Sequence, residues 1–129
     1  MLKVKRLMSN DRLEEIFSLR EQFMEKINTH IPGAYPEWPV DLTSKNDQQA
    51  IREFAFRGME ELFEALLHLK NWKNHRTGCG DFDRAEFLEE MIDAYKYFTA
   101  ILVLVGVDSD EFFEAYKNKH NKICSRLDG

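Results

Sequence analysis

The chain carries the same helix-start signal at three separate places. In each, an aspartate is followed three residues later by a glutamate, just before apolar residues that recur every three or four positions. The three pairs are Asp11 with Glu14, Asp83 with Glu86, and Asp108 with Glu111. An aspartate in this place accepts hydrogen bonds from the free N–H groups of a first helical turn. Because the apolar period is also helical, the sequence predicts an all-α protein.

Loop signals divide the chain into four predicted helices. Residues 30–46 hold all three prolines and are expected to form an extended linker. Gly106 follows the third apolar pattern, in the position where glycine commonly ends a helix. The helices are expected at residues 11–28, 47–73, 83–105 and 108–126. In the last helix, the residues predicted to pack inward are Phe112, Phe113, Ala115, Tyr116 and Ile123.

Length and composition limit the classes that remain. The 129 residues fit one domain, so a single four-helix bundle-like domain over residues 1–129 is predicted. A net charge of -5 and the lack of a basic stripe argue against nucleic-acid binding. The longest apolar run, residues 100–107, is far shorter than the ~20 residues that cross a membrane. The two cysteines, Cys79 and Cys124, lack metal-ligand spacing, and a cytoplasmic location is expected.

The predicted second helix has apolar residues on two faces. A narrow stripe of Phe56, Phe63 and Leu67 lies opposite the broad apolar face. A helix with two apolar faces is buried on both, and so small a chain offers few partners for the second face. We therefore expect a homodimer or a dimer of dimers, that is, a homotetramer.

Two acidic stretches dominate the candidate functional residues. Residues 60–64 read Glu-Glu-Leu-Phe-Glu, and residues 89–93 read Glu-Glu-Met-Ile-Asp. Glutamates four residues apart, such as Glu60 and Glu64, repel each other by roughly 0.2 to 0.5 kcal/mol on an exposed helix. Solvated helix faces are the alternative interpretation. Two antiparallel helices would instead point four carboxylates at one metal ion, and these ligands are Glu61, Glu64, Glu90 and Asp93.

The chemistry of this set favours particular metals and reactions. Carboxylates without cysteine or paired histidine ligands prefer Mg²⁺ or Mn²⁺ to Zn²⁺. A di-iron bundle would need Glu-x-x-His motifs, and neither acidic stretch contains one. An acidic metal site, a basic last helix and no glycine-rich phosphate loop together indicate nucleotide hydrolysis in which metal and side chains hold the phosphates.

The two motifs resemble those of the all-α nucleoside triphosphate pyrophosphatases, the superfamily of the dimeric dUTPases and the MazG-like enzymes. Glu-x-x-Glu at residues 61–64 and Glu-x-x-Asp at 90–93 match its shared pattern, with Glu60 preceding the first. The flanks at residues 70–73 and 93–98 and the tail at 116–129 look closer to the dUTPase branch. The tail departs from that branch in the spacing of Asn121 and Arg126 and in lacking a final tyrosine.

The resemblance implies Mg²⁺-dependent cleavage of a nucleoside triphosphate, such as dUTP or a related pyrimidine deoxynucleotide, to the monophosphate and pyrophosphate. Beside the four metal ligands, it implies Glu60 as a further candidate for accepting the proton of the attacking water. The implied substrate-binding residues are Lys119, Asn121, Arg126, Trp72, Gln22 and Asn28. Two alternatives remain: a MazG-like enzyme for other or modified triphosphates, and a non-catalytic helical scaffold.

Overall fold

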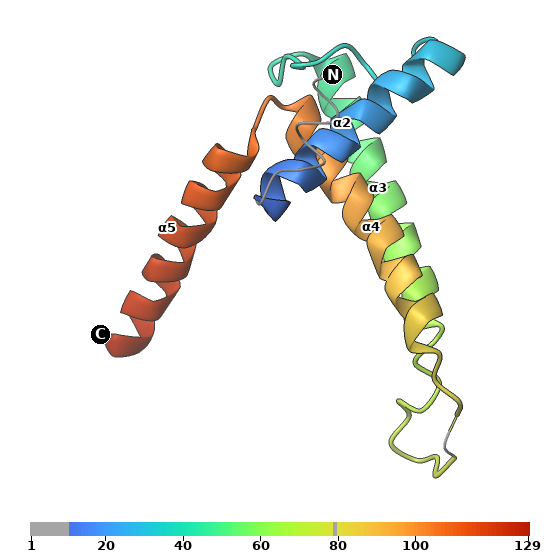
Figure 1. Cartoon of the computed structure of the whole chain (residues 1–129). Coiled ribbons are helices and arrows are strands. Elements are labelled where there is room, and N and C mark those ends of the chain that lie inside the picture. The colour runs from blue at the N-terminus through green and yellow to red at the C-terminus, as the bar shows by residue number, and fades with distance from the viewer. Residues whose placement is uncertain (1–10, 79) are drawn as a thin grey trace. The chain divides into compact units, whose positions relative to one another are not determined.

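The three aspartates begin helices as predicted. In the computed structural model, which describes residues 11–78 and 80–129, each aspartate accepts a hydrogen bond from the N–H three residues on, at 2.8 to 3.1 Å. The helices are α2 (Arg12–His30), α3 (Lys45–Leu66), α4 (Arg84–Leu104) and α5 (Ser109–Asp128) (Figure 1). Since the described residues form these four helices and no strand, the all-α prediction is confirmed. Cys79 lies outside the described residues.

The helix predicted at residues 47–73 begins two residues earlier, as α3 at Lys45, and the prediction is wrong at the C-terminal end, because α3 stops at Leu66. Ser44 caps the helix by accepting the Asp47 N–H, and the Asp47 carboxylate accepts a hydrogen bond from the Asp41 N–H at 2.8 Å. At the other end, the N–H groups of residues 67–69 bond three residues back, which tightens and ends the helix. Leu67 and Trp72 beyond this point are exposed. Without apolar burial, helical periodicity alone does not extend a helix.

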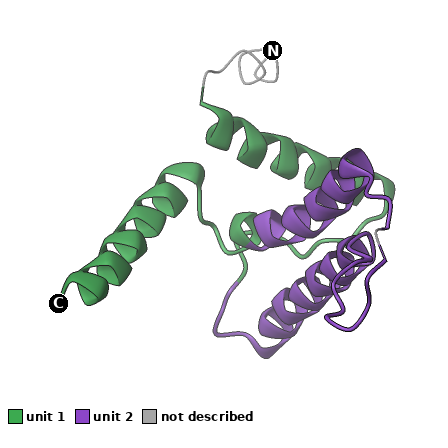
Figure 2. Cartoon of the chain, turned by 90° about the horizontal axis from the view of Figure 1, so that it is seen from below, with its two compact units in different colours: residues 1–40, 102–129 green, residues 41–101 purple. Residues whose placement is uncertain are grey.

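The chain forms two compact units (Figure 2). One comprises Met1–Val40, of which residues 11–40 are described, together with Leu102–Gly129. The other comprises Asp41–Ile101. The first therefore contains α2 and α5, and the second contains α3 and all but the last turn of α4.

In the first unit, the proline-containing linker is fastened at three points. The Asn28 side chain accepts the Tyr35 N–H at 2.8 Å and donates to the Tyr35 carbonyl at 3.3 Å. The Trp38 indole N–H donates to Glu21 at 3.0 Å. Further on, the Val40 N–H donates to the Leu104 carbonyl at 2.8 Å, at the end of α4. The linker thus follows α2 closely, which its composition did not predict.

Gly106 ends α4, as predicted, and has a second role. Its φ of 83° lies in the left-handed region that glycine adopts without strain. A Cβ at this position would also lie 3.2 Å from Pro39 Cβ. Glycine is therefore suited both to the turn before α5 and to the close passage of the linker.

The predicted inward packing of α5 is wrong. No residue of this helix is buried; Phe112 is half-buried, and its ring centroid lies 5.8 Å from that of Phe17 on α2. The other residues predicted to pack inward, Phe113, Ala115, Tyr116 and Ile123, are exposed. The sequence pattern correctly predicted an apolar stripe on α5, but such a pattern does not identify the surface that covers the stripe.

Candidate metal centre

Helices α3 and α4 approach closely at Gly58. A Cβ on this glycine would lie 3.1 Å from Tyr97 Cβ and 3.3 Å from the Phe98 ring. Near the same point, the rings of Phe54 and Tyr97 are 6.4 Å apart between centroids. Small residues continue the contact, because Ala65 on α3 and Ala94 on α4 are both buried. The two helices lie side by side (Figure 1), close enough for polar groups one turn further on to meet.

Three of the four predicted metal ligands meet beside this contact. Glu61 and Glu64 of α3 and Glu90 of α4 each offer a carboxylate oxygen, and these oxygens all lie within 4.8 Å of one another. Glu61 and Glu90 are half-buried, whereas Glu64 is exposed. Oxygen-only donors at this spacing fit a hard divalent cation such as Mg²⁺ or Mn²⁺.

The electrostatics of the group centre on Glu61. Partial burial raises the pKa of its carboxyl above the ordinary value of 4.5, and the neighbouring charge of Glu64 and a hydrogen bond with that residue raise it further. The charges of Asp93 and Glu90 act in the same direction. Both effects disfavour the ionised form of a carboxyl group. Folding thus brings together negative charges that a proton or a cation would stabilise.

The remaining candidate acids lie outside this close group. Asp93 is exposed, one turn along α4 from Glu90, and its charge contributes to the raised pKa of Glu61. Glu60 is exposed on α3 and is not one of the three converging residues. Spacing along each helix placed the acids on adjacent faces, but only the packing of α3 on α4 determines which oxygens meet.

A histidine and a small cavity adjoin the carboxylates. Nε2 of His68 lies 4.0 Å from Oε1 of Glu90 on the facing helix. His68 also lines a cavity of about 190 Å³. The other lining residues are Leu69, Lys70, Asn71, Gly80, Asp81 and Phe82. The sequence placed His68 one turn after Glu64, but the contact with Glu90 depends on the pairing of the helices.

The predicted base-binding residues have different surroundings. The Asn28 amide is engaged at both ends by the backbone of Tyr35, which gives it a structural role in the linker. Gln22, also on α2, is half-buried. Trp72 is largely exposed, with Lys73 Nζ 5.5 Å from its ring centroid, so it is not a core tryptophan.

The predicted phosphate-binding residues Lys119, Asn121 and Arg126 are all exposed on α5. They belong to the first unit, whereas the three converging carboxylates belong to the second.

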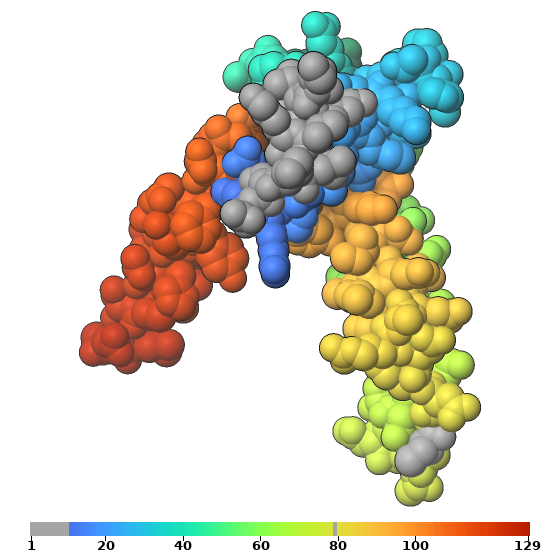
Figure 3. Space-filling model, viewed as in Figure 1, coloured from blue at the N-terminus to red at the C-terminus, as the bar shows by residue number. Residues whose placement is uncertain are grey.

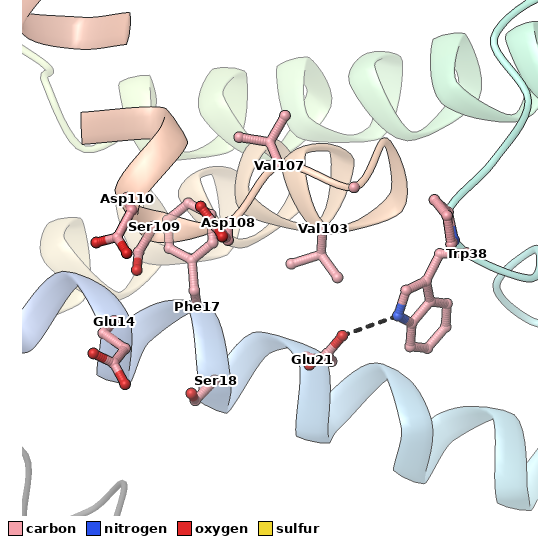
Figure 4. A pocket seen from close by; sticks show the side chains of 12 residues that line it. Glu14, Phe17, Ser18, Glu21, Trp38, Val103, Val107, Asp108, Ser109 and Asp110 are labelled. Carbon is pink, nitrogen blue, oxygen red and sulfur yellow. Dashed lines mark hydrogen bonds between the residues drawn. The ribbon is translucent and has the colours of Figure 1, made fainter. Parts of the chain in front are cut away.

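A larger cavity, which the sequence did not predict, lies within the first unit. It measures about 580 Å³ and is bounded by α2, the linker and the segment from the end of α4 to the start of α5 (Figure 4). Phe17 and Val103 are buried in its wall, and the Trp38 indole closes one side. Its four acidic lining residues are Glu14, Glu21, Asp108 and Asp110.

Comparisons with known proteins add no relative. No protein-family model matches the chain, no curated protein matches it, and no solved structure matches it. Among the described residues, no helix combines the length and the apolar character that crossing a membrane requires.

Proposed function

We propose that this chain is a Mg²⁺-dependent pyrophosphohydrolase that converts a nucleoside triphosphate to its monophosphate and pyrophosphate. The observation that supports this most is the meeting of Glu61, Glu64 and Glu90 within 4.8 Å. The motifs at residues 61–64 and 90–93, which resemble those of the all-α pyrophosphatases, supply the expected reaction. A pyrimidine deoxynucleotide such as dUTP is the proposed substrate.

The roles of the acidic residues follow from their chemistry. Glu61, Glu64 and Glu90 would hold the cation, with Asp93 as a fourth ligand from the next turn of α4. A bound divalent ion would lower the pKa of water and neutralise charge on the polyphosphate. Glu60 or one of the four ligand carboxylates would accept the proton that the attacking water loses.

The histidine beside Glu90 orients that carboxylate in this proposal. Half-buried His68 approaches Glu90 from the turn that follows α3, and groups that neighbour metal ligands commonly fix their orientation. Lys119, Asn121 and Arg126 remain the proposed phosphate ligands, and Trp72 and Gln22 the proposed contacts to the base.

Pyrophosphate release from a panel of ribo- and deoxynucleoside triphosphates, with Mg²⁺ and with chelator, tests the proposal. We expect release from at least one pyrimidine deoxynucleotide only in the presence of metal. Reaction in water labelled with heavy oxygen should place the label in the monophosphate, because attack is proposed at the α phosphorus. Label in pyrophosphate would reject attack at α, and label in orthophosphate would identify an ordinary phosphatase.

No release from any triphosphate would instead favour the scaffold alternative. In that case the acidic cluster would be a solvated helix face with no catalytic role.

A further inference from the structure

Helix α5 has an apolar stripe that the rest of its own unit leaves uncovered. Phe113, Tyr116, Ile123 and Leu127 are exposed by 51%, 66%, 46% and 81%. At 100° per residue these four side chains lie within about 80° of one another around the helix axis. The surface of this helix is seen in red in Figure 3. Large apolar patches of this kind mark contact surfaces on soluble proteins.

The charges of α5 are divided between its two halves. Residues 109–116 contain Asp110, Glu111 and Glu114 and no lysine or arginine. Residues 117–128 contain the acidic Asp128 and four cations, Lys117, Lys119, Lys122 and Arg126. Lys117 pairs with Glu114 at 3.0 Å, but no ion pair joins the other three cations to another residue in the described part of the chain. The basic half therefore has three cations available to a partner.

The acidic end of α5 extends beyond the helix itself. Asp108 and Asp110 line the 580 Å³ cavity together with Glu14 and Glu21 of α2, and none of its lining residues is a lysine, arginine or histidine (Figure 4). Caps and helix dipoles account for acids at each helix start. Caps and dipoles do not neutralise the four carboxylates around this cavity, which a positively charged partner group would stabilise.

We propose that α5 pairs in an antiparallel orientation with α5 of a second copy of this chain. Antiparallel pairing places the acidic half of each helix beside the basic half of the other, and it opposes the two helix dipoles. A parallel pair would instead bring lysine beside lysine. Charge complementarity therefore selects both the partner and its direction.

The apolar stripe fixes the register of the pair. With His120 at the twofold axis, Phe113 faces Leu127 of the second copy, and Tyr116 lies within one residue of facing Ile123 of the second copy. The same surface patch then serves both chains, as a twofold interface requires. Arg126 of each copy comes to Glu114, in the acidic half of the other α5. This inference uses no residue of the carboxylate cluster on α3 and α4, although Lys119 and Arg126 are also the proposed phosphate ligands.

Site-specific cross-linking tests the pairing in the full-length chain. In a Cys79→Ser, Cys124→Ser background, His120→Cys places a thiol at the predicted axis, and Asn118→Cys places one on the opposite side of α5. We expect mild oxidation to give a covalent dimer of the His120→Cys protein at micromolar concentration. Equal cross-linking of both variants, or none of His120→Cys, would overturn the proposal.

Charge exchange provides the matched test. Added to the His120→Cys protein, Lys117→Glu with Lys122→Glu gives both halves of α5 a net negative charge, whereas Asp110→Lys with Glu114→Lys gives both halves a net positive charge. Each form alone should cross-link at least about tenfold more slowly, and mixing the two should restore the rate. Circular dichroism checks that both remain helical. Unchanged rates, or no rescue on mixing, would contradict the pairing, as would binding to anionic lipid vesicles without cross-linking.

Discussion

At the scale of single residues, the carboxylate cluster of Glu61, Glu64 and Glu90 raises the pKa of one member, Glu61. Glu61 is half-buried, and Glu64, Asp93 and Glu90 all raise its pKa. A proton therefore binds this group more tightly in the folded chain than in the unfolded one. The stability that Glu61 contributes is complete below its ordinary pKa of 4.5 and is lost as the pH rises through the raised folded value. At neutral pH and without metal, ionised Glu61 opposes folding.

The Glu61→Gln substitution tests whether ionised Glu61 lowers the stability of the metal-free protein at neutral pH. We expect the metal-free variant to melt at a higher temperature than the wild type at pH 7, and the difference to disappear near pH 4. With Mg²⁺ at saturation the order should reverse, because the variant lacks a ligand. Glu89→Gln, which removes an exposed acid beside Glu90, is the control and should show neither effect. A metal-free variant less stable than the wild type at pH 7 would show that ionised Glu61 does not oppose folding.

The Asp93→Asn substitution tests whether Asp93 is a metal ligand or an acid that only faces solvent. If Asp93 completes the metal site, its loss should lower kcat by orders of magnitude, since metal stabilisation of a transition state is worth several kcal/mol. Lys119→Ala and Arg126→Ala should mainly raise KM, because phosphate is charged in both ground and transition states. Steady-state kinetics on the best triphosphate distinguish the two patterns. A fully active Asp93→Asn enzyme would show that this acid only faces solvent.

At the scale of helices, the metal centre depends on how closely α3 approaches α4. Gly58 sets this distance, and the buried Ala65 and Ala94 maintain it along the pair. The sequence correctly placed Glu61, Glu64 and Glu90 together because residues three apart share a helix face. The sequence did not predict that Asp93 would be exposed and apart from the other three acids, because packing determines helix rotation and side-chain rotamers.

Gly58→Val should disturb the metal centre without touching a ligand. The added side chain meets Tyr97 and Phe98, and overpacking of this kind costs about 1 to 3 kcal/mol. Wild-type melting temperature should rise with millimolar Mg²⁺ or Mn²⁺ by linkage. In Gly58→Val that rise should shrink, and in Glu64→Gln it should nearly vanish. Gly78→Ala, where an added Cβ meets nothing within 4 Å, is the control. If Gly58→Val showed the full metal-induced rise in melting temperature, the metal centre would not depend on the close contact between α3 and α4.

At the scale of the whole molecule, signals that act within one helical turn predict structure more accurately than signals that depend on contacts distant in the sequence. Asp11, Asp83 and Asp108 predicted helix starts to within about one residue, because a cap bonds only to its own first turn. Burial was harder to predict. Phe54 is buried although it lies outside both predicted stripes of α3, and the stripe of α5 is exposed where an inward face was expected. Periodicity identifies an apolar face but not the surface that covers it.

The prediction of a homodimer or homotetramer depends on the narrow apolar stripe of α3. Phe56, Phe63 and Leu67 are each more than half exposed. Three large apolar side chains on one stripe favour association with a second chain. If this stripe forms one interface and α5 another, the two together would produce the predicted dimer of dimers. The two interfaces use separate residues and can therefore be removed one at a time.

Light scattering of stripe variants measures the contribution of α3. With both interfaces formed, we expect the wild type to be tetrameric at micromolar concentration and Phe63→Glu to be a dimer of half that mass, because a charge cannot be buried unpaired at an apolar contact. Glu53→Gln, which alters an exposed acid on the same helix, should leave the mass unchanged. In the His120→Cys background, Phe63→Glu should still cross-link through α5, since that contact does not involve α3. A monomeric wild-type protein would refute both interfaces, whereas an unchanged mass for Phe63→Glu would refute only the α3 stripe.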